Sequence, residues 1–143
     1  MGLIRLARAP LEVSPTASVL DAIRTMTEGQ VGAIAVTQGR KVLGVFTERD
    51  LMRRVVYEGK DPERTPITEA MSSPAVTVST TTSVAEAATI MKSRHIRHLA
   101  VVDGRGDLVG MVALRYLLYD MMEQLELKVD DLHGYMMADG PGG

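Results

Sequence analysis

The sequence contains no cysteine and no tryptophan, and it has a single phenylalanine among its 143 residues. The lack of cysteine excludes disulfides, thiolate nucleophiles and cysteine-ligated metal centres. Aromatic residues make up only 3% of the chain, so the stacking platforms that bind single-stranded nucleic acid are nearly excluded as well. The formal net charge of -2 argues against general nucleic-acid binding, because neutralising phosphates normally requires a basic surface.

Long apolar runs are also missing. No run approaches the roughly 18 residues that cross a bilayer, and residues 1–13 lack the continuous apolar segment and the cleavage site of a signal peptide. Hydrophobic residues account for 45% of the chain and charged residues for 24%, which is the balance of a globular protein. We therefore expect a cytoplasmic protein that has no membrane partner.

The chain does contain an internal repeat. Residues 18–36 align without gaps on residues 83–101, and several serine, valine, alanine and methionine residues are identical between them. After a one-residue insertion the alignment continues and brings Gly44 onto Gly110. The repeat therefore covers whole structural units and not only one motif.

Each copy shows the same order of predicted elements. A short alternating strand is followed by a helix that begins at Ser18 in the first copy and at Ser83 in the second, where the hydroxyl can cap a free N–H group. Two strands joined by a tight glycine-containing turn come next, and a last helix closes the copy. The pattern predicts an α/β (α+β) fold made of two βαββα units related by a pseudo-two-fold axis.

Composition shifts divide the chain into four parts. We expect the first repeat at residues 1–58, a polar and proline-broken linker at residues 59–66, the second repeat at residues 67–128 and a flexible tail at residues 129–143. Residues 66–71 are compatible with a single helical turn that leads into the second repeat.

The two copies differ where the last strand meets the last helix. In the first copy, Thr47 and Asp50 place a hydroxyl and a carboxylate in the first helical turn. A carboxylate can accept hydrogen bonds from the two hydroxyls of a ribose, and a helix N-terminus attracts phosphate. The same two residues also fit an ordinary helix cap, and the local pattern alone favours the cap.

The repeat and the segment ending at Asp50 together resemble the CBS domain, and the chain from about residue 10 to residue 125 resembles a tandem CBS pair, or Bateman module. Gly44, Val45, Thr47 and Asp50 match the family's G-h-[ST]-x-x-D signature, where h is hydrophobic. The resemblance implies a stand-alone regulatory or energy-sensing module that binds AMP, ADP, ATP or NAD as a ligand and requires no cofactor. It further implies a homodimer of CBS pairs and a regulated protein that the sequence does not identify.

The resemblance also implies which residues contact the nucleotide. Asp50 holds the ribose hydroxyls, Thr47 bonds near the ribose or the phosphate, and the second copy supplies the adenine slot. The slot residues are Ala75, Val76, Thr77, Ile96, Arg97, His98 and Ala100. Arginine suits phosphate because it offers paired donors, and the candidates for phosphate contacts beside the slot are Arg49, Arg53, Arg94 and His95. Arg53 fits an ordinary solvated helix face equally well.

The second copy departs from the signature. Ala113 replaces the hydroxyl residue and Tyr116 replaces the carboxylate. We therefore expect one competent adenosine site, with Tyr116 filling or partly closing the other cleft, although a phenol can still stack on a ligand or bond to it.

Two other interpretations stay open. One is a dimerisation or interaction platform that has no ligand, and the least favoured is an enzyme that acts on nucleotides. His95 and His98 have a spacing seen in metal sites, but no cysteine and no neighbouring carboxylate accompanies them, so no metal site is expected.

Overall fold

Each copy of the repeat forms its own three-stranded sheet in the computed structural model, which describes residues 3–139, with side chains described as far as residue 129. In both sheets the first two strands are parallel and the last two are antiparallel. The strands are β1 (Glu12–Val13), β2 (Ala33–Gln38) and β3 (Lys41–Thr47), then β4 (Thr77–Ser79), β5 (His98–Val102) and β6 (Leu108–Ala113). The predicted α+β class and the tandem βαββα order are confirmed.

Capped helices connect the first two strands of each sheet. They are α1 (Val19–Gly29) and α4 (Val84–Arg94). Ser18 Oγ accepts a hydrogen bond from the Asp21 N–H at 3.1 Å, and Asp21 Oδ2 accepts one from the Ser18 N–H at 3.0 Å. This pair of bonds satisfies two of the free donors at the start of α1. Ser83 caps α4 in the same way by accepting from the Glu86 N–H at 3.1 Å.

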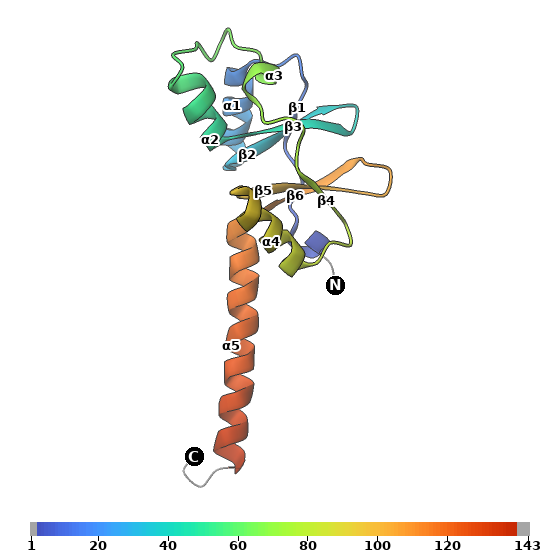
Figure 1. Cartoon of the computed structure of the whole chain (residues 1–143), viewed down its shortest axis with the longest axis vertical. Coiled ribbons are helices and arrows are strands. Elements are labelled where there is room, and N and C mark those ends of the chain that lie inside the picture. Colours follow the sequence, from blue (N-terminus) through green and yellow to red (C-terminus); the bar gives the residue numbers. More distant parts are fainter. Residues whose placement is uncertain (1–2, 140–143) are drawn as a thin grey trace.

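The closing helices of the two copies differ in length. In the first copy α2 (Glu48–Asp50) continues as the π-helical segment η2 (Leu51–Val56), whereas in the second copy α5 (Leu114–Asp139) is a single long helix that projects away from the sheets (Figure 1). A flexible tail is expected from residue 129, and the structure continues α5 through these positions as far as Asp139. Residues 129–139 contain one glycine and no proline, so nothing stops the helix there. The remainder of the predicted tail, residues 140–143, lies outside the described residues.

Two short helical turns cross from one copy to the other. The turn α3 (Ile67–Ala70) has the helical form that the sequence predicts, but it covers the core of the first repeat instead of leading into the second. The Ile67 N–H donates to the Ala17 carbonyl at 2.9 Å. At the N-terminus, η1 (Leu3–Leu6) does the same for the second repeat, where Leu3 is fully buried.

The crossing segments explain the glycine that both copies carry in the last strand. A Cβ on Gly44 would lie 2.8 Å from the Ser72 carbonyl oxygen, and a Cβ on Gly110 would lie 2.7 Å from Ala7 Cβ. Both distances are shorter than van der Waals contact, so the incoming segment can approach the strand only where the side chain is absent. The glycine of the signature is therefore a packing requirement in both copies.

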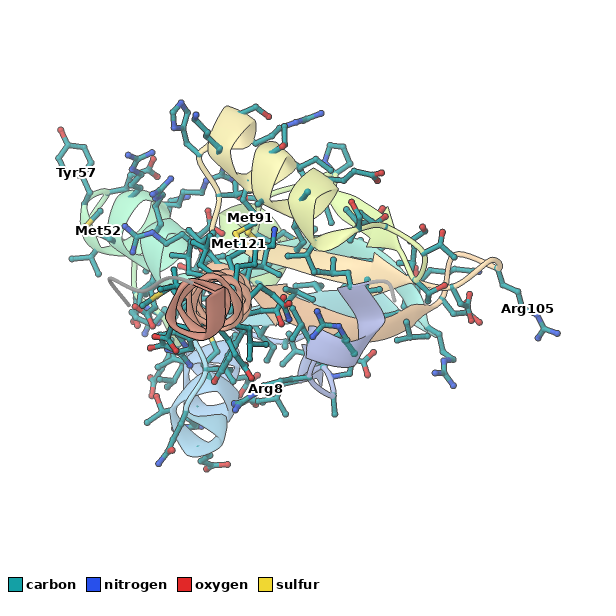
Figure 2. All side chains as sticks on the ribbon, turned by 90° about the horizontal axis from the view of Figure 1, so that it is seen from below. Arg8, Met52, Tyr57, Met91, Arg105 and Met121 are labelled. Carbon is teal, nitrogen blue, oxygen red and sulfur yellow. The ribbon has the colours of Figure 1, made fainter. Side chains whose placement is uncertain are left out.

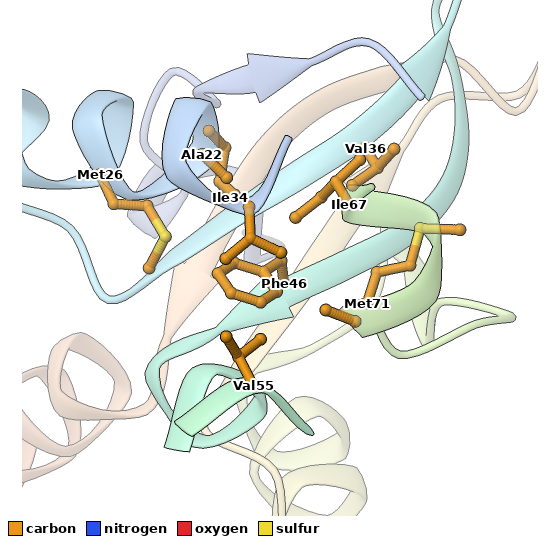
Figure 3. Packing of buried hydrophobic residues seen from close by; sticks show 10 residues of the cluster. Ala22, Met26, Ile34, Val36, Phe46, Val55, Ile67 and Met71 are labelled. Carbon is orange, nitrogen blue, oxygen red and sulfur yellow. The ribbon is translucent and has the colours of Figure 1, made fainter. Parts of the chain in front are cut away.

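Three clusters of buried side chains make up the core. In the first repeat, Phe46 lies at the centre of one cluster, with Ile34 and Val55 on either side (Figure 3). The second repeat has its own cluster around Leu99. Between the two sheets lies a third cluster, built largely from small residues, which are Ala33, Ala35, Val45, Ala100 and Leu108. Small side chains on the inner faces let the sheets pack closely and place the two repeats side by side.

Candidate functional site

Asp50 lies at the junction of β3 and α2, and only 6% of its surface is exposed. Its Oδ2 accepts hydrogen bonds from the Thr47 N–H at 3.0 Å and from Thr47 Oγ1 at 3.2 Å. In return, Thr47 Oγ1 accepts from the Asp50 N–H at 3.2 Å. The two signature residues thus form a complete capping box, which is the second of the two roles that the sequence left open.

The other carboxylate oxygen of Asp50 is held by Ser72, which sequence reasoning missed, and by Arg54. Ser72 Oγ donates to Asp50 Oδ1 at 2.9 Å, and Arg54 Nε lies 3.7 Å from the same oxygen. Arg54 also donates to the Met71 carbonyl at 2.7 Å. Arg54, and not its neighbour Arg53, is therefore the arginine beside the candidate ribose clamp. Ser72 arrives on the crossing segment after α3, so no local motif around Asp50 indicates it.

The second repeat approaches the start of α2 from the opposite side. Arg49 Nη1 donates to the His95 carbonyl at 2.7 Å, which ties the candidate phosphate residues of the two repeats together. His98 lies close to the segment before β2, because a Cβ built on Gly32 would be 3.5 Å from His98 Cε1 and 2.8 Å from Glu48 Oε1. The two repeats therefore present basic and acidic groups to each other next to the Thr47–Asp50 cap.

The remaining predicted residues are dispersed around this junction. Ala75 is partly buried against the cluster between the sheets, and Thr77 pairs with Ala100 across β4 and β5. Ala100 is fully buried and pairs with strands on both sides, so it offers no free surface to a ligand. Val76 and Ile96 pack partly on the core of the second repeat. Arg53, Arg94 and Arg97 have exposed side chains.

The equivalent place in the second repeat is occupied by a stack of side chains. The guanidinium of Arg8 lies 4.4 Å from the ring centre of Tyr116, and that of Arg115 lies 5.0 Å from it. Arg8 pairs with β6 through Met111, just as Ser72 pairs with β3 through Val45. Arg8 and Tyr116 thus take the positions that Ser72 and Asp50 take in the first repeat, and a cation–π contact replaces the hydrogen bond.

Two shallow depressions flank the repeats, and neither is lined by Thr47 or Asp50. The first, of about 390 Å³, contains the Arg8–Tyr116 pair and the bidentate ion pair of Arg5 with Asp120. Arg8, labelled in Figure 2, contacts Tyr116 in the first turn of α5. The second, of about 310 Å³, lies between α1 and α2 and includes Glu48 and Arg115. Within the described part of the chain, no group of three or more potential metal ligands comes together, and no helix is long and apolar enough to span a membrane.

The surroundings of His98 shift the pKa of its imidazole. Burial lowers its pKa, the Glu48 carboxylate raises it, and the Arg115 and Arg97 guanidinium groups lower it further. The net direction is downward, so the ring favours the neutral form. A neutral imidazole can still donate one hydrogen bond and accept another.

Comparison with known proteins places this geometry in context. The family model of the CBS domain matches residues 5–57 and again residues 67–123. The CBS domain-containing protein YhcV of Bacillus subtilis is 36% identical over 110 residues, which are 77% of each protein. Protein MK0525 of Methanopyrus kandleri is 34% identical over 73% of this chain, which spans only 54% of that relative. The structure of CBS domain protein PAE2072 from Pyrobaculum aerophilum, complexed with AMP, matches 87% of this chain and 95% of its own with a TM-score of 0.77 and 30% identity.

Proposed function

Since this chain belongs to the CBS domain family and carries two CBS domains in tandem, we propose that it is a regulatory module that binds one adenosine nucleotide and catalyses no reaction. The observation that carries the proposal is the asymmetry of the two junctions. The first holds a carboxylate at a helix start beside basic groups of the opposite repeat, whereas the second holds a tyrosine stacked under arginine.

The proposed site is the junction around Asp50. A ribose supplies two hydroxyl donors, and the Asp50 carboxylate is an acceptor for both. Ser72 Oγ donates to Asp50 Oδ1, and a ribose hydroxyl bound to this oxygen takes the place of the serine hydroxyl. The carboxylate then exchanges one donor for another and is never left buried without a partner.

The opposite repeat supplies the rest of the proposed site. Small and apolar residues just before β4, Ala75 and Val76, flank the base, and backbone groups near Arg97 and His98 read its edge. Arg49 already lies between the repeats through its bond to the His95 carbonyl, and its guanidinium is placed for a phosphate. The AMP of the Pyrobaculum aerophilum protein supports the adenosine class of ligand.

Calorimetric titration with AMP, ADP, ATP and NAD tests the proposal. We expect at least one of these to bind the wild type with a stoichiometry of one per chain. Asp50→Ala should weaken the binding at least about tenfold, because it removes the charged acceptor of two hydrogen bonds. The matched control is Asp21→Ala, which removes the same type of capping-box carboxylate from α1 and should leave the affinity unchanged.

Three results would contradict the proposal. If no nucleotide binds the wild type, the chain is better described as a ligand-free interaction platform. Equal affinity in Asp50→Ala and Asp21→Ala would place the ligand elsewhere. Conversion of ATP to ADP or AMP during the titration, with or without magnesium, would show an enzyme.

A further inference from the structure

An exposed apolar stripe runs along α5 from the end of the second CBS domain into the part of the helix beyond it. The family match ends at residue 123, yet the helix continues to Asp139. Figure 1 shows this part projecting away from both sheets. Of the exposed large apolar or aromatic side chains on α5, Leu118, Met122, Leu125 and Val129 lie along one side of the helix, and Tyr119 and Leu127 lie off that line.

These four residues follow the spacing of a coiled-coil seam. The intervals of four, three and four residues place Leu118 and Leu125 at d positions and Met122 and Val129 at a positions of a heptad repeat. In the sequence the spacing continues with leucine at position 132 and methionine at position 136. No charged residue interrupts the series, and leucine occupies every d position. A pattern of this kind needs a facing helix that has the same repeat.

The seam faces away from the body of its own chain. Leu117, which is fully buried in the core of the second repeat, and Asp120, which pairs with Arg5 at 2.9 Å, fix α5 to the body from other faces of the helix. The side chains at positions 122, 125 and 129 are 57%, 60% and 63% exposed. A second helix can therefore approach the seam without displacing any described contact.

We propose that α5 pairs with α5 of a second copy of this chain as a parallel two-stranded coiled coil whose seam is formed by Leu118, Met122, Leu125 and Val129. This inference rests on the proposed function, for which a homodimer is expected. It names the surface through which the two copies of that homodimer pair. Leucine occupies both d positions of this seam, and the a positions hold Met122 and Val129. Leucine at d with a β-branched residue such as Val129 at a favours two parallel strands.

The charges beside the seam favour the parallel orientation. Glu126 lies at an e position and Lys128 at a g position. In an antiparallel pair centred between Leu125 and Val129, residues at e positions face e positions of the other helix, and residues at g positions face g positions. Glu126 would then lie opposite the partner's Glu126, and Lys128 opposite the partner's Lys128. In a parallel pair, e faces g of the other helix, and neither like-charged contact forms.

Engineered disulfides test the geometry directly, because the chain has no cysteine of its own. In Met122→Cys, the two thiols of a parallel pair come within the Cα separation of about 4.4–6.8 Å that a disulfide requires. An antiparallel pair would hold them roughly 15 Å apart along the helix axis. We expect mild oxidation of Met122→Cys to give a covalent dimer on a denaturing gel.

Leu127→Cys is the matched control, because Leu127 is 53% exposed on the same helix but lies off the seam. It should link far more slowly. Adding Leu125→Lys and Val129→Lys to Met122→Cys should abolish the link, whereas adding Leu127→Lys should leave it intact. Equal linking at positions 122 and 127, or none at 122, would overturn the coiled coil.

The molar mass of the wild type, measured by light scattering, shows whether the chain is a dimer at all, separately from whether α5 forms the interface. A dimeric mass with no link in Met122→Cys rejects the coiled coil and keeps a dimer that pairs elsewhere. A monomeric mass rejects both. Nucleotide titration of the same samples reports separately on the site at Asp50.

Discussion

One residue at the junction of the two repeats, His98, has a pKa that differs between the folded and the unfolded chain. His98 is half buried at the start of β5, where Glu48, Arg97 and Arg115 act on it. Because burial is the largest cause, its pKa in the folded chain lies below the value of about 6.5 that an exposed histidine has. The unfolded chain therefore binds a proton at a higher pH than the folded chain does.

The sign of the resulting pH dependence follows from this difference. As pH falls below about 6.5, histidine is protonated in the unfolded state first, so folding loses stability until the pKa of folded His98 is passed. We expect the free energy of unfolding in urea to fall between pH 7.5 and pH 5.5, and His98→Gln to show a smaller fall. The control is His95→Gln, at an exposed position. If the free energy of unfolding falls equally in the wild type and in His98→Gln, then His98 is not the cause of the pH dependence.

Sequence reasoning found Thr47 and Asp50 because they are three residues apart in one turn. It did not find Ser72 or Arg8, although each contacts the residue at the signature's last position, in one copy or the other. Both residues reach their partners through the crossing of a segment to the other repeat. Contacts of this kind produce no periodic pattern of residues in the sequence. The short turns at residues 3–6 and 67–70 are also too dissimilar in sequence to be recognised as equivalent parts of the repeat.

At the scale of elements, both connecting helices end on a strained residue. Gln30 after α1 and His95 after α4 have φ angles of 55° and 56°, in the left-handed region. The two positions correspond in the repeat, so the geometry is a property of the unit. Most L-residues pay roughly 1–2 kcal/mol for this conformation, whereas glycine does not. The sequence does not indicate these caps, because neither position carries the glycine that usually marks them.

Relief of this strain should stabilise the protein. We expect Gln30→Gly and His95→Gly each to raise the free energy of unfolding by about 1 kcal/mol, measured by urea denaturation followed by circular dichroism. The bond from Arg49 to residue 95 uses the backbone carbonyl and survives the change. Arg24→Gly, in the exposed middle of α1, should instead lower the stability by about 1 kcal/mol. A loss of stability in both cap variants would contradict the strain.

The strand pairing was predictable to a greater degree than the helix ends. Short runs of apolar residues joined by glycine-containing turns define β2, β3, β5 and β6, and pairing across a tight turn leaves little choice of partner. The length of α5 was not predictable from burial patterns, because the side chains at residues 122–129, the last that the structure describes, are all exposed. Its apolar residues follow a heptad and not the wider face of a helix that covers a sheet.

At the scale of the whole molecule, the chain is held together by its first residues. Leu3 is fully buried in the core of the second repeat, and its N–H donates to the Thr82 carbonyl at 2.8 Å. Arg8 then joins the edge of β6 by two backbone bonds with Met111, at 2.9 and 3.0 Å. Residues near the N-terminus are thus core residues of the half of the protein that is farthest along the sequence.

Shortening the side chain of Leu3 should therefore destabilise the protein as much as shortening a leucine that is buried in a β-sheet. We expect Leu3→Ala to lower the free energy of unfolding by about 3 kcal/mol, within the range for buried leucines. Leu6→Ala, in the same turn but only half buried, should cost clearly less. Urea titration followed by circular dichroism measures both variants. Equal losses at the two positions would show that Leu3 is not part of the core.

Each repeat has its core covered by the short turn that precedes the other repeat, so neither core is complete without the other repeat. A single repeat that carries its own leading turn has an uncovered core and a turn with no core to join. Two such chains complete each other only by trading their turns. In one chain, the segment between α3 and β4 joins the two repeats, so an encounter between two molecules becomes a local step of folding.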